Sequence, residues 1–256
     1  MDGMIGLLAG LGGLALGGAL NAAAIRWDER LPARYPPTYC IHGGHPLRRL
    51  RGLPALGYAL TRGRCPACGR KVALVYPFGE AALALSWALA GLQLGPSREL
   101  AAALLLIALL YVIVQTDLSA LVIPDAVVAA GIAGALLMRL WSHPLPLWNY
   151  GAAALAGSGL LLAIGVLCSL LLRKEALGGG DVKLYVPLGL LLGLELTLLS
   201  LLLASVAGLA GALILRLSGR DARQLPFGPA IAAGALCAYW WGAQWVDAYL
   251  RLLQPV

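Results

Sequence analysis

Two aspartates stand at the edges of long apolar runs, where carboxylates able to act on a peptide bond could meet. Asp117 directly follows an apolar run, and Asp181 lies in Gly178-Gly-Gly-Asp-Val-Lys183, just before another. Two carboxylates that share a site cannot both ionise easily, so one of them keeps a proton. Such a pair can serve as general base and general acid on an attacking water, which is aspartyl peptidase chemistry. The glycines before Asp181 would let an extended substrate backbone approach closely.

Simpler roles exist for these residues. Asp181 suits the N-cap of a helix that follows it, and Asp125 suits the N-cap of another. Intramembrane carboxylates also relay protons in proton-coupled transporters. Sequence spacing alone does not bring Asp117 and Asp181 together, so these alternatives stay open at this point.

The elements that must position these residues are membrane helices. The chain is 60% hydrophobic and 12% charged, with a mean hydropathy of +0.82, whereas soluble domains carry about 25% charged residues. Apolar segments of a length that can cross a bilayer recur, and their backbone groups must pair internally as helices. We expect an all-α integral membrane protein with a bundle of eight transmembrane helices. The expected spans are 4–25, 77–94, 100–116, 126–141, 150–172, two separated by a break near 193–195 within 184–217, and 227–249.

Charge distribution orients this bundle. Ten of the 19 Lys and Arg residues lie between Arg26 and Lys71. With the N-terminus outside and the first helix retained, all basic residues except Arg98, Arg139 and Arg251 become cytoplasmic, as the positive-inside rule requires. The same distribution argues against nucleic acid as a partner and for membrane lipid. Both aspartates then face the cytoplasm at similar depth. We expect a first helix (1–25), a small cytoplasmic domain (26–76) and a seven-helix membrane domain (77–256).

The motifs resemble those of the type IV prepilin leader peptidases along the whole chain. Asp117 followed by Ile123-Pro-Asp125, and then Gly178-Gly-Gly-Asp181, resemble the two aspartate signatures of that family. The resemblance extends to three other segments: Gly18–Arg26, Arg64-Cys-Pro-Ala-Cys68 with Tyr76-Pro-Phe-Gly-Glu80, and Pro226-Phe-Gly-Pro229.

This resemblance implies a function and a site. Members cleave the basic leader of prepilins or pseudopilins after a Gly, at the cytoplasmic face of the bacterial inner membrane. Asp117 and Asp181 would be the catalytic pair and Asp125 would be structural. Gly178, Gly180 and Lys183 would support the site. Neither the pilus nor the secretion apparatus is singled out as the destination of the substrate.

The cytoplasmic segment carries half of a zinc site, Cys65-Pro-Ala-Cys68, whereas a structural site needs four ligands. The family commonly supplies a second Cys-x-x-Cys upstream. Cys40 fits the spacing of that pair, but Gly43 stands where its partner would be. We expect zinc on Cys40, Cys65, Cys68 and His45, with His42 as the other candidate. A degenerate knuckle without metal is the alternative, and an inert zinc-knuckle adaptor is a third interpretation of the chain.

Bacterial members with this segment also methylate the new N-terminal amine with S-adenosylmethionine. The expectation of that cofactor and activity rests on resemblance alone. Glu80 matches the Glu of the family's Tyr-Pro-x-x-Glu, and a carboxylate there could orient or deprotonate the amine. The alternative is an interfacial Glu paired with an Arg of the cytoplasmic segment.

Overall fold

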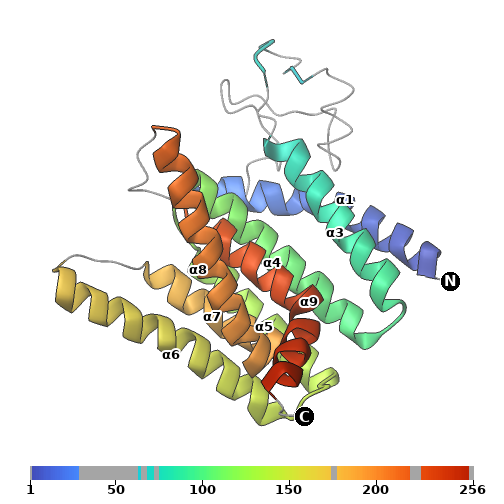
Figure 1. Cartoon of the computed structure of the whole chain (residues 1–256). Helices are drawn as coiled ribbons and strands as arrows, with labels where there is room; N and C mark the ends of the chain where they lie inside the picture. The colour runs from blue at the N-terminus through green and yellow to red at the C-terminus, as the bar shows by residue number, and fades with distance from the viewer. Residues whose placement is uncertain are drawn as a thin grey trace. The chain divides into compact units, whose positions relative to one another are not determined.

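A computed structural model of the chain describes residues 2–28, 63–64, 68–71, 75–173, 178–219 and 226–253. Within these ranges the chain forms eight helices and no strand, which confirms the all-helical prediction (Figure 1). In chain order they are α1 (Asp2–Asp28), α3 (Val75–Leu94), α4 (Arg98–Ala120), α5 (Asp125–Trp141), α6 (Leu147–Leu172), α7 (Gly179–Leu192), α8 (Leu194–Leu217) and α9 (Gly228–Leu253).

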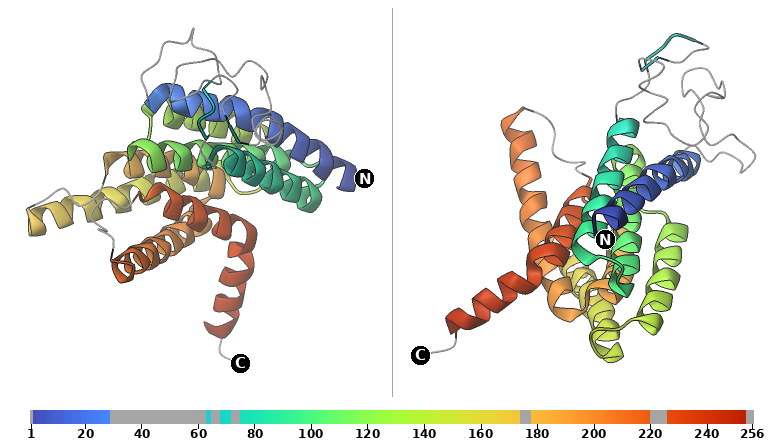
Figure 2. Two further views of the ribbon diagram at one scale, coloured as in Figure 1. Left: turned by 90° about the horizontal axis from the view of Figure 1, so that it is seen from above. Right: turned by 90° about the vertical axis from the view of Figure 1, so that its right-hand side faces the viewer.

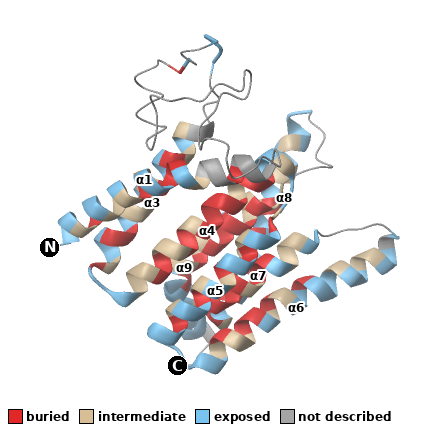
Figure 3. Cartoon of the chain, turned by 180° about the vertical axis from the view of Figure 1, so that it is seen from behind, coloured by how far each residue is buried: buried red, intermediate tan, exposed pale blue. Residues whose placement is uncertain are grey.

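Among the described residues, four segments are long and apolar enough to cross a bilayer, judged by length and composition. They are Asp2–Leu20 in α1, the whole of α4 and α8, and Leu147–Leu171 in α6. Burial differs among them: α4 is mostly buried, whereas much of α6 is exposed (Figure 3). Exposed Leu and Ile side chains on a helix are what lipid, rather than water, would solvate. The protein is therefore a multi-pass membrane protein.

The chain folds as two compact units, Met1–Ser119 and Ala120–Val256. In the first unit α1 and α3 lie side by side along a seam of small residues. A Cβ added at Gly13 would lie 3.0 Å from the Cα of Ala84, and one added at Gly91 would lie 2.9 Å from the Cα of Gly6. Such glycines let membrane helices approach until their backbones touch.

In the second unit α6 packs against α7 and α8, α5 packs against α7, and α8 packs against α9. Glycine again marks the closest approaches. A Cβ at Gly234 of α9 would lie 2.6 Å from the backbone nitrogen of Ala204 in α8. The far part of α9 turns away from its first part, as the left view of Figure 2 shows. The stacked rings of Trp241 and Trp245 lie on this far part.

α7 is the shortest helix of the described chain, with 14 residues and a length of about 21 Å. It ends at Gly193, whose φ of +79° is a conformation that side-chain-bearing residues rarely adopt. α8 starts at the next residue, so the predicted break near 193–195 is confirmed.

Candidate functional site

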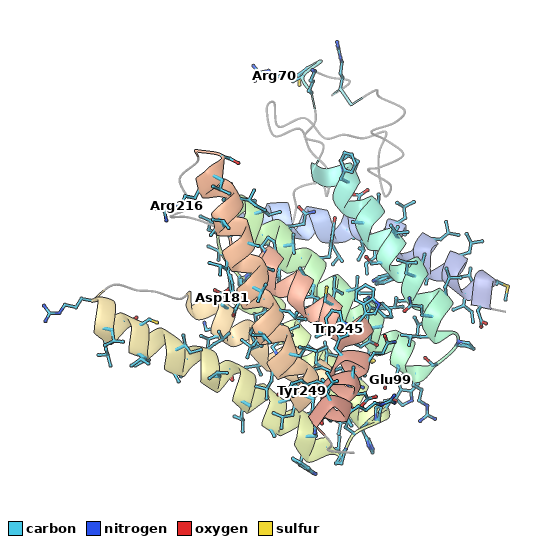
Figure 4. The ribbon with its side chains drawn as sticks, in the orientation of Figure 1. Arg70, Glu99, Asp181, Arg216, Trp245 and Tyr249 are labelled. Atoms are coloured by element: carbon cyan, nitrogen blue, oxygen red, sulfur yellow. The ribbon has the colours of Figure 1, made fainter. Side chains whose placement is uncertain are left out.

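Asp181 lies in the first turn of α7 and is half-buried (Figure 4). The helix begins at Gly179, before the apolar run that starts at residue 184. Gly179, Gly180 and Asp181 therefore belong to the helix, and Gly178 lies at its cap. Gly178 is the N-cap, and no side chain caps this end. The N-cap role considered for Asp181 is therefore wrong. A carboxylate in a first turn is stabilised by the unpaired amides and the positive end of the helix dipole.

The glycines around Asp181 differ in how closely they are packed. A Cβ at Gly180 would lie 3.0 Å from the Cβ of Ile123, which is tighter than ordinary contact. Gly179 has nothing within 4 Å of where a Cβ would stand, and one at Gly178 would lie 3.5 Å from an Asp181 carboxylate oxygen. Gly180 therefore permits a close approach to the segment that precedes α5, while Gly179 leaves open space at the start of α7.

Lys183 and Asp125 form an ion pair, with Nζ 2.8 Å from Oδ1. It connects the beginning of α7 with the first turn of α5. The two side chains are 57% and 74% exposed, so the pair contributes no more than about 1 kcal/mol to stability. Asp125 stands in the first turn of α5, and the N-cap is Pro124, so the N-cap role considered for Asp125 is also wrong.

The ion pair and the Gly180–Ile123 contact bring together the segments 123–125 and 178–183. These are two of the three pieces that carry the aspartate signatures. They are distant in sequence and join at one end of the second unit.

Asp117 lies in the last turn of α4 and is buried. The helix continues to Ala120, beyond the predicted end of this span. The neighbouring Thr116 hydroxyl donates to the carbonyl oxygens of Val112 and Ile113, at 3.1 and 3.2 Å. Asp117 belongs to the first unit and Asp181 to the second, so their pairing stays a prediction from the sequence.

Arg139 fixes the opposite end of α7. Its side chain is 5% exposed, and its guanidinium donates to the carbonyl oxygens of Leu190 (3.2 Å) and Leu191, in the last turn of α7. It also stacks over the ring of Tyr150 in α6, 4.6 Å from the centroid. A cation at a helix C-terminus satisfies carbonyls that lack helical partners.

In the sequence, Arg139 stands out only as an exception to the charge distribution, and its role at the end of α7 was not predicted. The signal was a basic residue inside the apolar run 126–141. Asn149 of α6 likewise satisfies a backbone group at a helix end. Its side-chain oxygen accepts a hydrogen bond from the backbone N–H of Leu194, the first residue of α8, at 2.9 Å.

Glu80 of α3 is completely buried, in the seam between α3 and α1. A Cβ at Gly17 of α1 would lie 3.1 Å from its Cγ. The sequence predicts a chemical role for Glu80, and complete burial of a carboxylate is costly enough to suggest a function. The Arg residues of the alternative pairing lie mostly outside the described residues.

Most of the predicted zinc site also lies outside the described residues, namely Cys40, His42, His45 and Cys65. Cys68 is described and exposed. Arg64 and Lys71 form an isolated antiparallel bridge across the segment that holds Cys65 and Cys68. Within the described ranges no three His, Cys, Asp or Glu side chains are close enough to bind a metal.

Known proteins match the chain over most of its length. The type IV leader peptidase family matches residues 104–213, and the bacterial peptidase A24 N-terminal domain matches residues 11–94. A "Prepilin leader peptidase/N-methyltransferase" of Bacillus subtilis (strain 168) is 31% identical, covering 94% of this chain and 96% of its own. Proteins of the same name from Burkholderia pseudomallei (strain 1026b) and Aeromonas salmonicida (strain A449) are 36% and 32% identical. They cover 84% and 88% of this chain and 72% and 78% of their own.

No solved structure matches the chain significantly. The family resemblance predicted from the aspartate motifs is confirmed by these matches. The N-terminal domain match at residues 11–94 precedes the peptidase match at residues 104–213. The Bacillus subtilis relative aligns with 94% of the chain and so with both regions. The chain belongs to the type IV leader peptidase family.

Proposed function

We propose that the protein is an aspartyl endopeptidase that removes the leader from prepilins or pseudopilins and methylates the new N-terminus. The names of its relatives support this activity. The observation that supports it for this chain is the joining of segments 123–125 and 178–183, which brings together the aspartate-motif segments of the second unit. The relatives are named as peptidases, so the transporter alternative has no support.

Asp117 and Asp181 are the proposed catalytic pair. The ionised carboxylate takes a proton from water as the water oxygen attacks the carbonyl carbon of the Gly that ends the leader. The protonated carboxyl gives its proton to the leaving amine as the C–N bond breaks. In this proposal Gly178 and Gly179 make room for an extended substrate backbone, and Lys183 and Asp125 keep the start of α7 beside α5.

Methylation is assigned to the first unit. S-adenosylmethionine, when bound, supplies a methyl group and keeps the electron pair of the broken carbon–sulfur bond. Glu80 fits the task that remains for the protein, because a buried carboxylate can accept the proton that the amine must lose.

The proposed setting is the bacterial inner membrane with the catalytic side toward the cytoplasm. Eight spans with the N-terminus outside place sixteen of the 19 basic residues on that side. The segment 26–76 would then be a cytoplasmic zinc knuckle. The antiparallel bridge between Arg64 and Lys71, which flank Cys65 and Cys68 in the sequence, supports this proposal.

A direct assay tests the proposal. Detergent-purified protein is incubated with a prepilin, with and without S-adenosylmethionine, and the products are weighed by mass spectrometry. We expect loss of the leader after its Gly, and a gain of about 14 Da on the mature chain when the methyl donor is present. An intact prepilin after incubation with folded protein would contradict the peptidase assignment.

A further inference from the structure

The helix α9 leaves the packed part of the second unit near Gly242. A Cβ added at Gly242 would lie 2.7 Å from the Cδ2 of Leu196 and 3.0 Å from the Cδ2 of Leu199, both in the first two turns of α8. From Ala243 to Leu252 no residue of α9 is buried. The helix therefore extends by about three turns beyond its last close contact with α8.

This departure point lies at the end of a candidate membrane span. The span in α8 begins at Leu194, and Glu195 in its first turn is an exposed charge. Further along α8 the exposed side chains are apolar, as at Leu198 and Leu202. A charged side chain is costly within lipid, so Glu195 marks the level at which water begins. Because Gly242 packs on the same turns of α8, the far part of α9 starts at the boundary between lipid and water.

Aromatic side chains run along this far part. Trp241, Trp245 and Tyr249 recur every four residues and so form one stripe on the helix, the aromatic stripe. The two Trp rings stack with their centroids 6.4 Å apart, and all three side chains are exposed. Figure 4 shows Trp245 and Tyr249 on this part of the helix. Trp and Tyr rings, apolar with one polar atom, are enriched at the headgroup level of membranes.

Polar side chains occupy a separate, narrow arc. Gln244, Asp247 and Arg251 are three and four residues apart, which places them within about 60° of one another around the helix. This polar stripe lies about 130° from the aromatic stripe, and Val246 and Leu250 occupy the remaining side. A helix with one polar arc and a wider apolar surface is stable neither within water nor within the hydrocarbon core, and it lies in the interface between them.

We propose that the part of α9 beyond Gly242 lies along the membrane surface and binds the boundary between phospholipid headgroups and acyl chains. The aromatic stripe and Val246 face the acyl chains, and the polar stripe faces the headgroups and water. Asp247 and Arg251 are the charged residues of the segment 243–252, and they cancel. The segment therefore binds neutral phospholipid as well as anionic phospholipid, and this role is independent of both proposed activities.

The test maps depth in the full chain, reconstituted into phosphatidylcholine vesicles. An azide-bearing amino acid is placed singly at each of positions 244–250 and coupled to a nitroxide, which leaves the cysteines of the chain unchanged. Depth follows from the accessibility of the nitroxide to oxygen, which concentrates in lipid, and to a water-soluble nickel chelate. We expect labels at Trp245 and Tyr249 to lie about 5–10 Å deeper than labels at Gln244 and Asp247.

The profile should alternate with the helical period and show no net trend along the chain. A helix that continued across the bilayer would instead change depth steadily, by about 1.5 Å per residue. A steady trend of that kind would overturn the proposal.

Two matched substitutions test which side of the helix contacts lipid. Val246→Glu and Gln244→Glu introduce the same carboxylate, the first on the apolar side and the second in the polar stripe. With the nitroxide at Tyr249, Val246→Glu should move the label toward water by about 5 Å or more, whereas Gln244→Glu should leave its depth unchanged. Equal depths in the two variants would contradict contact between the apolar side and the acyl chains.

The remaining outcomes identify other occupants of this surface. The depth profile should be the same when anionic phosphatidylglycerol is mixed into the vesicles, and a profile that appears only with that lipid would overturn the assignment to neutral phospholipid. Uniform access of the nickel chelate to all labels would place the far part of α9 in water. Short nitroxide–nitroxide distances between labels at Trp245 of two chains would show that a second copy covers the aromatic stripe. Either result would overturn the lipid contact.

Discussion

Gly189 of α7 is the position where a single methyl group should disturb the helix that carries Asp181. A Cβ at this residue would lie 2.5 Å from the Cα of Ala154 and 2.6 Å from the carbonyl carbon of Ala153, both in α6. These are backbone atoms, so no side chain can rotate away. In Gly189→Ala the two helices must separate by about 1 Å to reach ordinary contact distance, which weakens their packing on both sides of the methyl group.

The expected cost of that overpacking is about 1–3 kcal/mol in the free energy of unfolding. Activity should fall further, because Asp181 lies two turns away on the same short helix. A displacement of about 1 Å at a reacting group can lower a rate about 10²-fold. We therefore expect cleavage of prepilin to slow by about 10–100-fold in Gly189→Ala.

The matched control is Gly159→Ala in α6, where a Cβ would have nothing within 4 Å. That substitution should stabilise its helix by up to about 1 kcal/mol and leave cleavage unchanged. Thermal unfolding in detergent and initial cleavage rates are measured for both variants. A melting temperature and a rate for Gly189→Ala equal to those of the control would refute the packing described for α6 and α7.

Three further predictions concern single side chains. Arg139→Met should lower the free energy of unfolding by about 2–4 kcal/mol, because it leaves the last carbonyls of α7 without donors; chemical unfolding measures this. Asp125→Asn should cost less than about 1 kcal/mol, since its ion pair with Lys183 is exposed, and the loss should shrink further in high salt. Glu80→Gln should abolish the 14 Da gain on the mature chain while leader removal continues, as mass spectrometry of both products can establish.

Much of the helical framework could be predicted from hydrophobicity, because backbone groups in lipid leave few alternatives to helices. The break at Gly193 was predictable in the same way, since the run 184–217 is too long for one span. The start of α7 was not. Three glycines have poor helix propensity, yet Gly179 and Gly180 are helical because Gly180 packs directly on Ile123, a contact distant in sequence.

The parts of the site that depend on such distant contacts were beyond the sequence. Lys183 and Asp125 are 58 residues apart, and their spacing contains no sign that the two side chains meet. Arg139 was visible as a charge within an apolar run, but its acceptors are backbone carbonyls, which every residue carries.

The central claim is that leader removal requires both Asp117 and Asp181. The most direct measurement is the initial rate of prepilin cleavage by the purified Asp117→Asn and Asp181→Asn variants, each first checked for an unchanged melting temperature. The proposed acid–base pair predicts that each single variant loses about 10²–10⁴-fold in rate, because either carboxyl alone cannot both accept and donate a proton. Cleavage at the unchanged rate by either variant would contradict the account.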